Sequence, residues 1–290
     1  MHATHPEPAP IEAAGAVQAA APAKSGTPVV PGALVLHASG LSLSRGRRRL
    51  IDRESFSLAP GQWMALTGPN GAGKSSLLRA LAGLLDWDDR PQFQLGSQPL
   101  ERLSTPPLLR LLFQGHAAGW KDALSVRENL RWQVSMDSED SRKGRTDPSA
   151  HPLLEAALQE SGMAAQADVP FGVLSAGQRR RVSLARLRIS LRSLDQPEGS
   201  LLWLLDEPAT ALDQEGQRLL GATLAALCAR GGMAIVATHG VIPGAPQASA
   251  LHLGGEGYGR GEGRKVERNL PREVGAGKAS GPVSPAEQAC

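Results

Sequence analysis

The stretch Gly68-Pro69-Asn70-Gly71-Ala72-Gly73-Lys74-Ser75 decides the fold, because it matches the phosphate-loop pattern G-x-x-x-x-G-K-[ST]. Glycines let the backbone curl round a phosphate with successive N–H groups pointing inward, and the N-terminal end of a following helix adds positive potential. In this pattern Lys74 reaches the β- and γ-phosphates, and the Ser75 hydroxyl can ligate Mg²⁺. The sequence therefore predicts a phosphate-binding site made by residues 68–75 and the next residue, Ser76.

The residues on either side of this loop have the patterns of a strand and a helix. Residues 63–67 are apolar except for Thr67, and residues 75–85 carry leucines at helical spacing. The run 201–205 has no polar residue, as expected of a strand buried on both faces of a parallel sheet. We also predict strands at 33–37, 55–58 and 233–238, and helices at 179–191 and 220–229. This alternation predicts an α/β domain that binds its ligand at the carboxyl ends of the strands.

Composition divides the chain into a globular middle and two tails. Residues 1–32 are rich in Ala, Pro and Gly and contain few bulky apolar residues, and residues 254–290 repeat glycine at short intervals. Such segments cannot bury enough apolar surface to offset the entropy of ordering, so we expect both to be disordered. The folded domain is expected to span residues 33–253.

Charge and cysteine content exclude several classes of protein. The 31 basic and 28 acidic residues give a net charge of +3, well short of the excess that nucleic-acid binding needs, so we expect no nucleic-acid partner. Two distant cysteines, Cys228 and Cys290, provide neither a disulfide framework nor a cysteine metal site. No apolar run approaches the roughly 20 residues that cross a bilayer.

An acidic pair follows the apolar strand at 201–205. Asp206 ends this strand, where a carboxylate faces the phosphate site and suits Mg²⁺, directly or through water. Glu207 comes next and can act as the general base that polarises the attacking water. An Asp-Glu pair before a helix is also a common helix start, so the pair gains its catalytic interpretation from the phosphate loop.

A third motif, Leu174-Ser175-Ala176-Gly177-Gln178, precedes the helix predicted at 179–191. A serine, a glycine and a helix start offer N–H groups and a hydroxyl to an anion. Taken alone, Ser175 would be an ordinary N-cap more often than a ligand.

Together these motifs resemble those of the ATP-binding cassette ATPases. Ala211-Leu212-Asp213 matches the loop that follows the acidic strand in that family, and His239 matches its switch histidine, which contacts the γ-phosphate. The departure is Ala176, where the family has a second glycine. The resemblance implies a parallel or mixed core sheet, a small antiparallel β subdomain and a helical signature subdomain. It also implies hydrolysis of ATP with Mg²⁺, with catalytic roles for Lys74, Glu207 and His239.

The resemblance further implies a homodimer. In this family the signature residues close over ATP that is held by the phosphate loop of a different cassette. We therefore expect Ser175, Gly177 and Gln178 of one chain to face residues 68–75 of a second chain.

The segment 114–130 indicates a subfamily. Its opening, Gly115-His116 followed by Gly119 and Lys121, resembles the ATPase subunit of the bacterial cytochrome c maturation system. Most cassettes carry a glutamine here that senses Mg²⁺. The usual register falls on His116, while Gln114 lies two residues earlier, so either residue could serve as the sensor.

The position that stacks on adenine is also unusual. Many cassettes have an aromatic residue before the glycine of a strand turn, whereas this chain has Arg45 before Gly46. A guanidinium plane can stack on a base. The alternative is that Arg45 belongs to a solvated basic turn.

The expected function is therefore the ATPase subunit of a transporter needed for cytochrome c biogenesis, acting in haem export or in release of a haem chaperone. It would dock on membrane subunits, peripherally on the cytoplasmic side of the bacterial inner membrane. The alternatives are a transporter ATPase for another exported substrate and a non-transport cassette protein. The latter typically carries two cassettes, a coiled-coil arm or zinc modules, none of which this sequence indicates.

Overall fold

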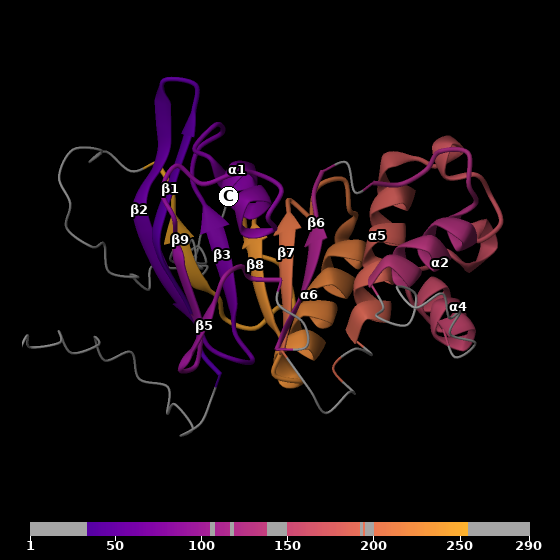
Figure 1. The fold of residues 1–290 in the computed structure, drawn as a ribbon. Helices are drawn as coiled ribbons and strands as arrows, with labels where there is room; N and C mark the ends of the chain where they lie inside the picture. The colour runs from indigo at the N-terminus through magenta and orange to yellow at the C-terminus, as the bar shows by residue number, and fades with distance from the viewer. Residues whose placement is uncertain are drawn as a thin grey trace, which may run out of the picture. The chain divides into compact units, whose positions relative to one another are not determined.

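A parallel sheet of five strands, in the order β6-β7-β8-β3-β9, supports the phosphate loop (Figure 1). The computed structural model describes residues 34–104, 108–116, 119–137, 150–191, 194 and 200–254. The strands of this sheet are β3 (Trp63–Thr67), β6 (Leu109–Gln114), β7 (Ser200–Asp206), β8 (Met233–Ala237) and β9 (Ser249–His252). Neighbouring strands pair in parallel throughout, so their carboxyl ends share one edge.

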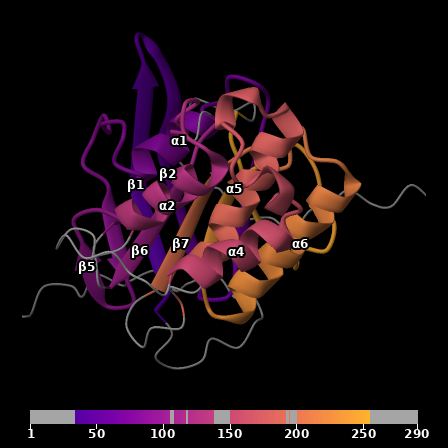
Figure 2. The same cartoon turned by 90° about the vertical axis from the view of Figure 1, so that its right-hand side faces the viewer.

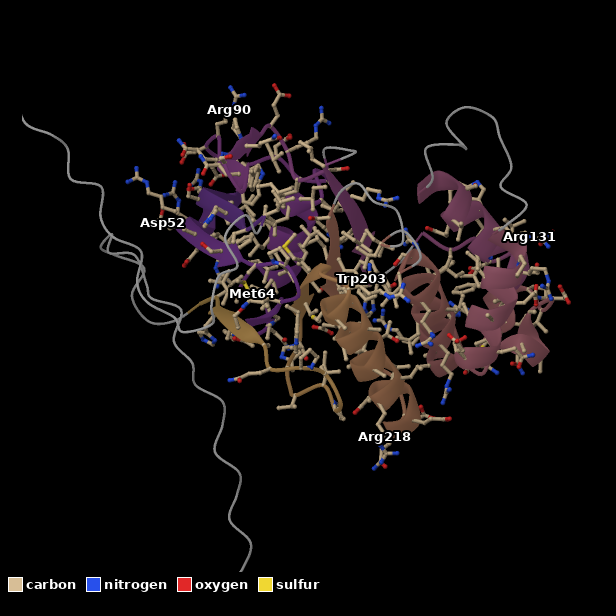
Figure 3. The ribbon with its side chains drawn as sticks, turned by 90° about the horizontal axis from the view of Figure 1, so that it is seen from below. Asp52, Met64, Arg90, Arg131, Trp203 and Arg218 are labelled. Atoms are coloured by element: carbon tan, nitrogen blue, oxygen red, sulfur yellow. The ribbon has the colours of Figure 1, made fainter. Side chains whose placement is uncertain are left out.

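Strand β7 is buried on both faces, as its unbroken apolar run predicts. Leu202 and Leu204 pack into the core on the side of the antiparallel sheet, whereas Leu201, Trp203 and Leu205 pack into the core under the helices. Figure 3 shows Trp203 and Met64 deep among the packed side chains. Both are completely buried, so each face of the sheet is sealed by large apolar side chains.

A four-stranded antiparallel sheet, in the order β2-β1-β4-β5, flanks the parallel one. Its strands are β1 (Leu36–Arg45), β2 (Arg48–Leu58), β4 (Gln92–Leu95) and β5 (Gln98–Leu100). The strands predicted at 33–37 and 55–58 cover only part of β1 and β2. Gly40 has a φ of +71°, and the β1–β2 register shifts nearby, so the bulges break the alternation by which a strand is recognised.

Helix α1 (Lys74–Leu81) begins inside the phosphate loop and is shorter than the predicted 75–85. Gly83 follows the helix with a φ of +72°, a left-handed conformation that commonly ends helices. Leu84 and Leu85 therefore do not lie on the apolar helix face predicted for them, and they are 64 % and 42 % exposed.

The helices α2 (Val126–Asp137), α4 (Ala150–Glu160), α5 (Ala176–Ser190) and α6 (Gln214–Ala229) pack together, with β7 and β6 behind them in Figure 2. Short 3₁₀ turns lie at Ala164–Gln166 and Phe171–Val173. Helix α5 is buried on two sides: Leu184 and Leu187 pack into the core against the parallel sheet, and Val182 and Ala185 pack into the core shared with α2 and α4. Helix α5 therefore links the two cores.

The fold class predicted from the sequence is confirmed: a parallel core sheet, an antiparallel β subdomain and a helical subdomain are all present. The described elements lie in one compact unit, Gly32–Cys290. In the described part of the chain, no helix combines the length and the apolar character that a membrane span requires. The two predicted tails lie outside the described residues, apart from Gly254.

Candidate nucleotide site

The phosphate loop joins β3 to α1 at the carboxyl edge of the parallel sheet. Position 68 requires glycine, because a Cβ there would lie 2.3 Å from the carbonyl oxygen of Leu253. Gly73 has a φ of +102° and packs its Cα against Leu50 of β2, where a Cβ would come within 3.1 Å of the leucine Cβ. Gly71 has a φ of +77°, and open space lies beside it. The loop is thus held by β2 and Leu253, while its central glycine has room for a ligand.

Lys74 is 6 % exposed and is oriented by the loop itself. Its Nζ donates to the carbonyl oxygens of Gly68 and Pro69, at 2.8 and 3.1 Å. An ammonium group has three donors, so this arrangement leaves one for an oxygen bound within the loop.

Ser75 and Asp206 meet at the sheet edge, although 131 residues separate them. The Ser75 Oγ donates to Oδ1 of Asp206 at 3.0 Å, and Asp206 is 4 % exposed. A hydroxyl and one carboxylate beside a phosphate loop fit Mg²⁺, which usually binds one or two carboxylates together with phosphates and waters. The donor set present here is therefore suited to that ion.

Glu207 begins the turn after β7 in a strained conformation. Its φ is +50°, in the left-handed region that non-glycine residues rarely occupy. Its backbone N–H donates to the carbonyl of Ala237, at 3.0 Å, and its carbonyl accepts from the N–H of Thr210, at 3.2 Å. Such strain persists where the surroundings determine it and is frequent at active sites. The backbone thus aims the Glu207 side chain.

The Glu207 carboxylate has a partner on each oxygen. Oε1 lies 3.1 Å from Nε2 of His239, which follows β8, and Oε2 accepts from the Thr210 hydroxyl at 3.4 Å. The structure therefore brings together the two residues that the sequence proposed as base and switch histidine. They come from adjacent parallel strands, which explains how residues 32 apart in sequence meet.

The signature residues lie elsewhere. Ser175 and Gln178 form a complete capping box: Oγ of Ser175 accepts from the N–H of Gln178 at 3.3 Å, and Oε1 of Gln178 accepts from the N–H of Ser175 at 2.9 Å. Helix α5 consequently starts at Ala176 and not at 179 as predicted. In Figure 1, β7 and β6 stand between α5 and α1. No hydrogen bond joins Ser175, Gly177 or Gln178 to the phosphate loop among the described residues.

The two candidate sensor residues differ in burial. Gln114 ends β6 opposite Leu205, is 2 % exposed, and has an Oε1 with no hydrogen-bond partner among the described residues. His116 is exposed in the turn that follows. Arg45 is exposed at the end of β1, in the hairpin whose second strand contacts the phosphate loop through Leu50.

Sequence reasoning missed Arg180. This side chain is 8 % exposed on α5, and its Nε donates to the carbonyl of Thr210 at 3.3 Å, in the turn after Glu207. Burial lowers the pKa of Arg180, while the carboxylates of Asp206 and Glu207 act to raise it. The sequence does contain a signal for the burial of Arg180: it lies four and seven residues before Leu184 and Leu187, and this spacing places it on the same helix face.

The fold and this loop define a P-loop ATPase domain with an added antiparallel sheet and helical subdomain. The model of the ABC transporter family matches residues 51–210. The chain is 40 % identical to the cytochrome c biogenesis ATP-binding export protein CcmA of Pseudomonas putida over 222 residues, which cover 76 % of this chain and 97 % of that protein. The Salmonella typhi protein of that name is 39 % identical over 226 residues, covering 78 % of this chain and all of that one.

The chain therefore belongs to the ABC transporter family, among its cytochrome c biogenesis ATP-binding export proteins. The resemblance inferred from the motifs is thus confirmed. Solved structures agree on the fold. A bacterial Atm1-family ABC exporter with ATP bound superposes with a TM-score of 0.58 at 20 % identity, covering 79 % of this chain and 39 % of that one. A putative ABC transporter ATP-binding protein from Pyrococcus furiosus gives a TM-score of 0.57 at 20 % identity, covering 76 % and 97 %.

Proposed function

We propose that this chain is the ATP-hydrolysing subunit of an exporter that serves cytochrome c biogenesis. The observation that carries the proposal is the near-complete coverage of relatives with that name, 97 % and 100 % of two of them at about 40 % identity. The similarity thus includes the segment between phosphate loop and signature, where family members differ most.

The proposed chemistry assigns a role to each part of the site. Residues 68–75 bind the phosphates of ATP, and the remaining donor of Lys74 reaches the β- and γ-phosphates. Ser75 and Asp206 would hold Mg²⁺, which neutralises phosphate charge when bound. Glu207 accepts a proton from the attacking water, and its two hydrogen-bond partners orient the carboxylate for that step. His239, which is hydrogen-bonded to Glu207, would contact the γ-phosphoryl group as it is transferred to water and ADP leaves.

The proposed active form is a homodimer. Ser175, Gly177 and Gln178 make no hydrogen bond with the phosphate loop of their own chain in the described residues, so their action on ATP requires a second copy. The exposed N-terminal end of α5 suits an anion, because its first N–H groups and the Ser175 hydroxyl lie there.

The proposed location is peripheral, on the cytoplasmic side of the bacterial inner membrane, with membrane subunits of the cytochrome c maturation system as partners.

We assign the role of Mg²⁺ sensor to Gln114 in preference to His116. Its buried Oε1, without a partner among the described residues, lies at the carboxyl end of β6, beside the strand that carries Asp206. Such an atom is costly to leave unsatisfied, so a bound ion or water is its natural partner.

Genetic replacement tests the pathway. A strain with Lys74→Ala should lose c-type cytochromes, whereas a strain with Arg218→Ala, an exposed position on α6, should keep them. Haem staining of membrane fractions, with immunoblots for the chain itself, measures the difference. Normal c-type cytochromes in the Lys74→Ala strain would refute the pathway while leaving the ATPase assignment intact.

A further inference from the structure

Helix α5 and the segment that follows Glu207 are joined at three successive points. A Cβ on Gly177 would lie 3.2 Å from the carbonyl oxygen of Ala211, so the backbones approach closely there. Arg180 donates through Nε to the carbonyl of Thr210. Arg181 donates through Nη2 to Asp213, at 2.9 Å to Oδ2, and to Glu215, at 2.9 Å to Oε2. The contacts cover the first two turns of the helix.

Arg180 is the buried member of these contacts. The ion pairs of Arg181 involve carboxylates that are 63 % and 80 % exposed, and such pairs contribute little. Arg180 is 8 % exposed and shares its helix face with Leu184 and Leu187, which pack against the parallel sheet. A buried guanidinium needs compensating acceptors, and here it has the Thr210 carbonyl and the nearby charges of Asp206 and Glu207.

Thr210 lies in the short turn that begins at Glu207 and orients the Glu207 side chain. The Thr210 N–H donates to the Glu207 carbonyl, and the Thr210 hydroxyl donates to the Glu207 carboxylate. Removing the donor of Arg180 would release Thr210 from α5 and loosen both of these contacts. Because Glu207 is held at a φ of +50°, a looser turn allows its backbone to relax away from this strained conformation.

We propose that Arg180 is a positioning residue that locks the turn carrying Glu207 to the helix that begins at Ser175. The inference rests on the proposed function, in which Ser175 contacts the nucleotide of the partner chain and Glu207 takes a proton from the water that attacks the nucleotide of its own chain. Through Arg180, closure of α5 on the partner's ATP sets the position of Glu207 in its own site. Each chain then couples the two nucleotide sites of the dimer through this one buried cation.

A substitution series on the full chain, purified with its native membrane partners, tests this role. Arg180→Met keeps the apolar stem and removes the donors, whereas Arg180→Lys keeps a cationic donor. The matched control is Arg188→Met on the same helix, which loses an ion pair with Glu160 of α4 and a hydrogen bond to Thr223 of α6 but no contact with the turn. We expect Arg180→Met to lower kcat by between about tenfold and about a hundredfold. Its ATP Kd should change by less than about twofold, and Arg180→Lys should keep most of kcat.

Thermal unfolding separates positioning from folding. The Tm of Arg180→Met should fall no further than that of Arg188→Met. If Arg180→Met and Arg188→Met have the same kcat, or if Arg180→Lys loses as much kcat as Arg180→Met, the positioning role is refuted. Failure of the proposed ATPase activity looks different, because the wild-type protein would then neither bind nor hydrolyse ATP.

Discussion

At the scale of single residues, the site depends on side chains whose backbone is held before the side chain acts. Glu207 adopts a left-handed φ, and both of its carboxylate oxygens have partners. A general base needs this placement, because proton transfer requires hydrogen-bond distance to the attacking water.

Glu207→Gln should therefore bind ATP and hydrolyse it at least about a hundredfold more slowly, since a neutral amide cannot accept the proton. Phosphate release measures hydrolysis, and fluorescent-nucleotide titration measures binding. Full ATPase activity in this variant would exclude Glu207 as the base. Glu215→Gln, an exposed glutamate eight residues later, is the matched control.

Arg45 allows a second test at this scale. If its guanidinium stacks on adenine, Arg45→Ala should raise the Kd for ATP by about threefold to about thirtyfold, because a cation–π contact contributes about 0.5–2 kcal/mol. Its cross-strand partner Arg48 is also exposed, and Arg48→Ala is the control. Unchanged ATP affinity in Arg45→Ala would support the solvated basic turn instead.

At the scale of elements, α6 makes a close backbone contact that the helix propensities of its residues do not predict. Gly221 lies in its interior, where a Cβ would come within 1.9 Å of the Pro243 carbonyl oxygen. The chain after β8 therefore runs directly across the helix backbone, and both parts are main chain that cannot rotate away.

Gly221→Ala should consequently destabilise the fold, although alanine favours a helix over glycine by about 1 kcal/mol. Urea unfolding measures the change in free energy. The next position provides the control: Ala222 is exposed, and Ala222→Gly should cost only about 1 kcal/mol. Stabilisation by Gly221→Ala would contradict the close approach.

Cys228, near the end of α6, gives a pH-dependent prediction. Burial raises the pKa of its thiol from 9.0 to about 11. The folded state therefore binds the proton more tightly than the unfolded state, so stability should fall as pH rises from about 9 to about 11. In a Cys290→Ser background, iodoacetamide should label Cys228 slowly at pH 8 and quickly after urea is added. Rapid labelling of the folded chain would contradict the burial.

At the scale of the whole molecule, the proposed function needs two chains. Helix α5 begins after the exposed Ser175, which makes no hydrogen bond with its own phosphate loop in the described residues. In the proposed dimer, each chain contributes two half-sites, and the second copy completes both.

Glu207→Gln with ATP and Mg²⁺ should therefore form a dimer that multi-angle light scattering detects. Adding Ser175→Asp should abolish the dimer, because aspartate caps a helix as well as serine does but repels the γ-phosphate. Helicity by circular dichroism checks that the cap survives. A Glu207→Gln chain that stays monomeric with ATP, even beside its membrane partners, would refute the proposed assembly.

The sequence alone predicted what depends on local chemistry. Gly68–Ser75 predicts a phosphate loop because its glycines and lysine act over eight consecutive residues, and the apolar run before Asp206 predicts a strand buried on both faces, which β7 confirms. The ends of elements were less predictable. Gly83 stops α1 early, and the capping box at Ser175 starts α5 early, because one residue's backbone conformation overrides the periodic pattern.

Only the tertiary structure decided which distant residues meet. Ser75 and Asp206 touch across 131 residues, and Glu207 and His239 across 32, because parallel strands bring their carboxyl ends to one edge. The run Arg179–Arg181 looks uniformly basic in sequence, yet the helix buries Arg180 beside the turn that follows Glu207. Charge is a property of the residue, whereas burial and partnership depend on what the folded chain places around it.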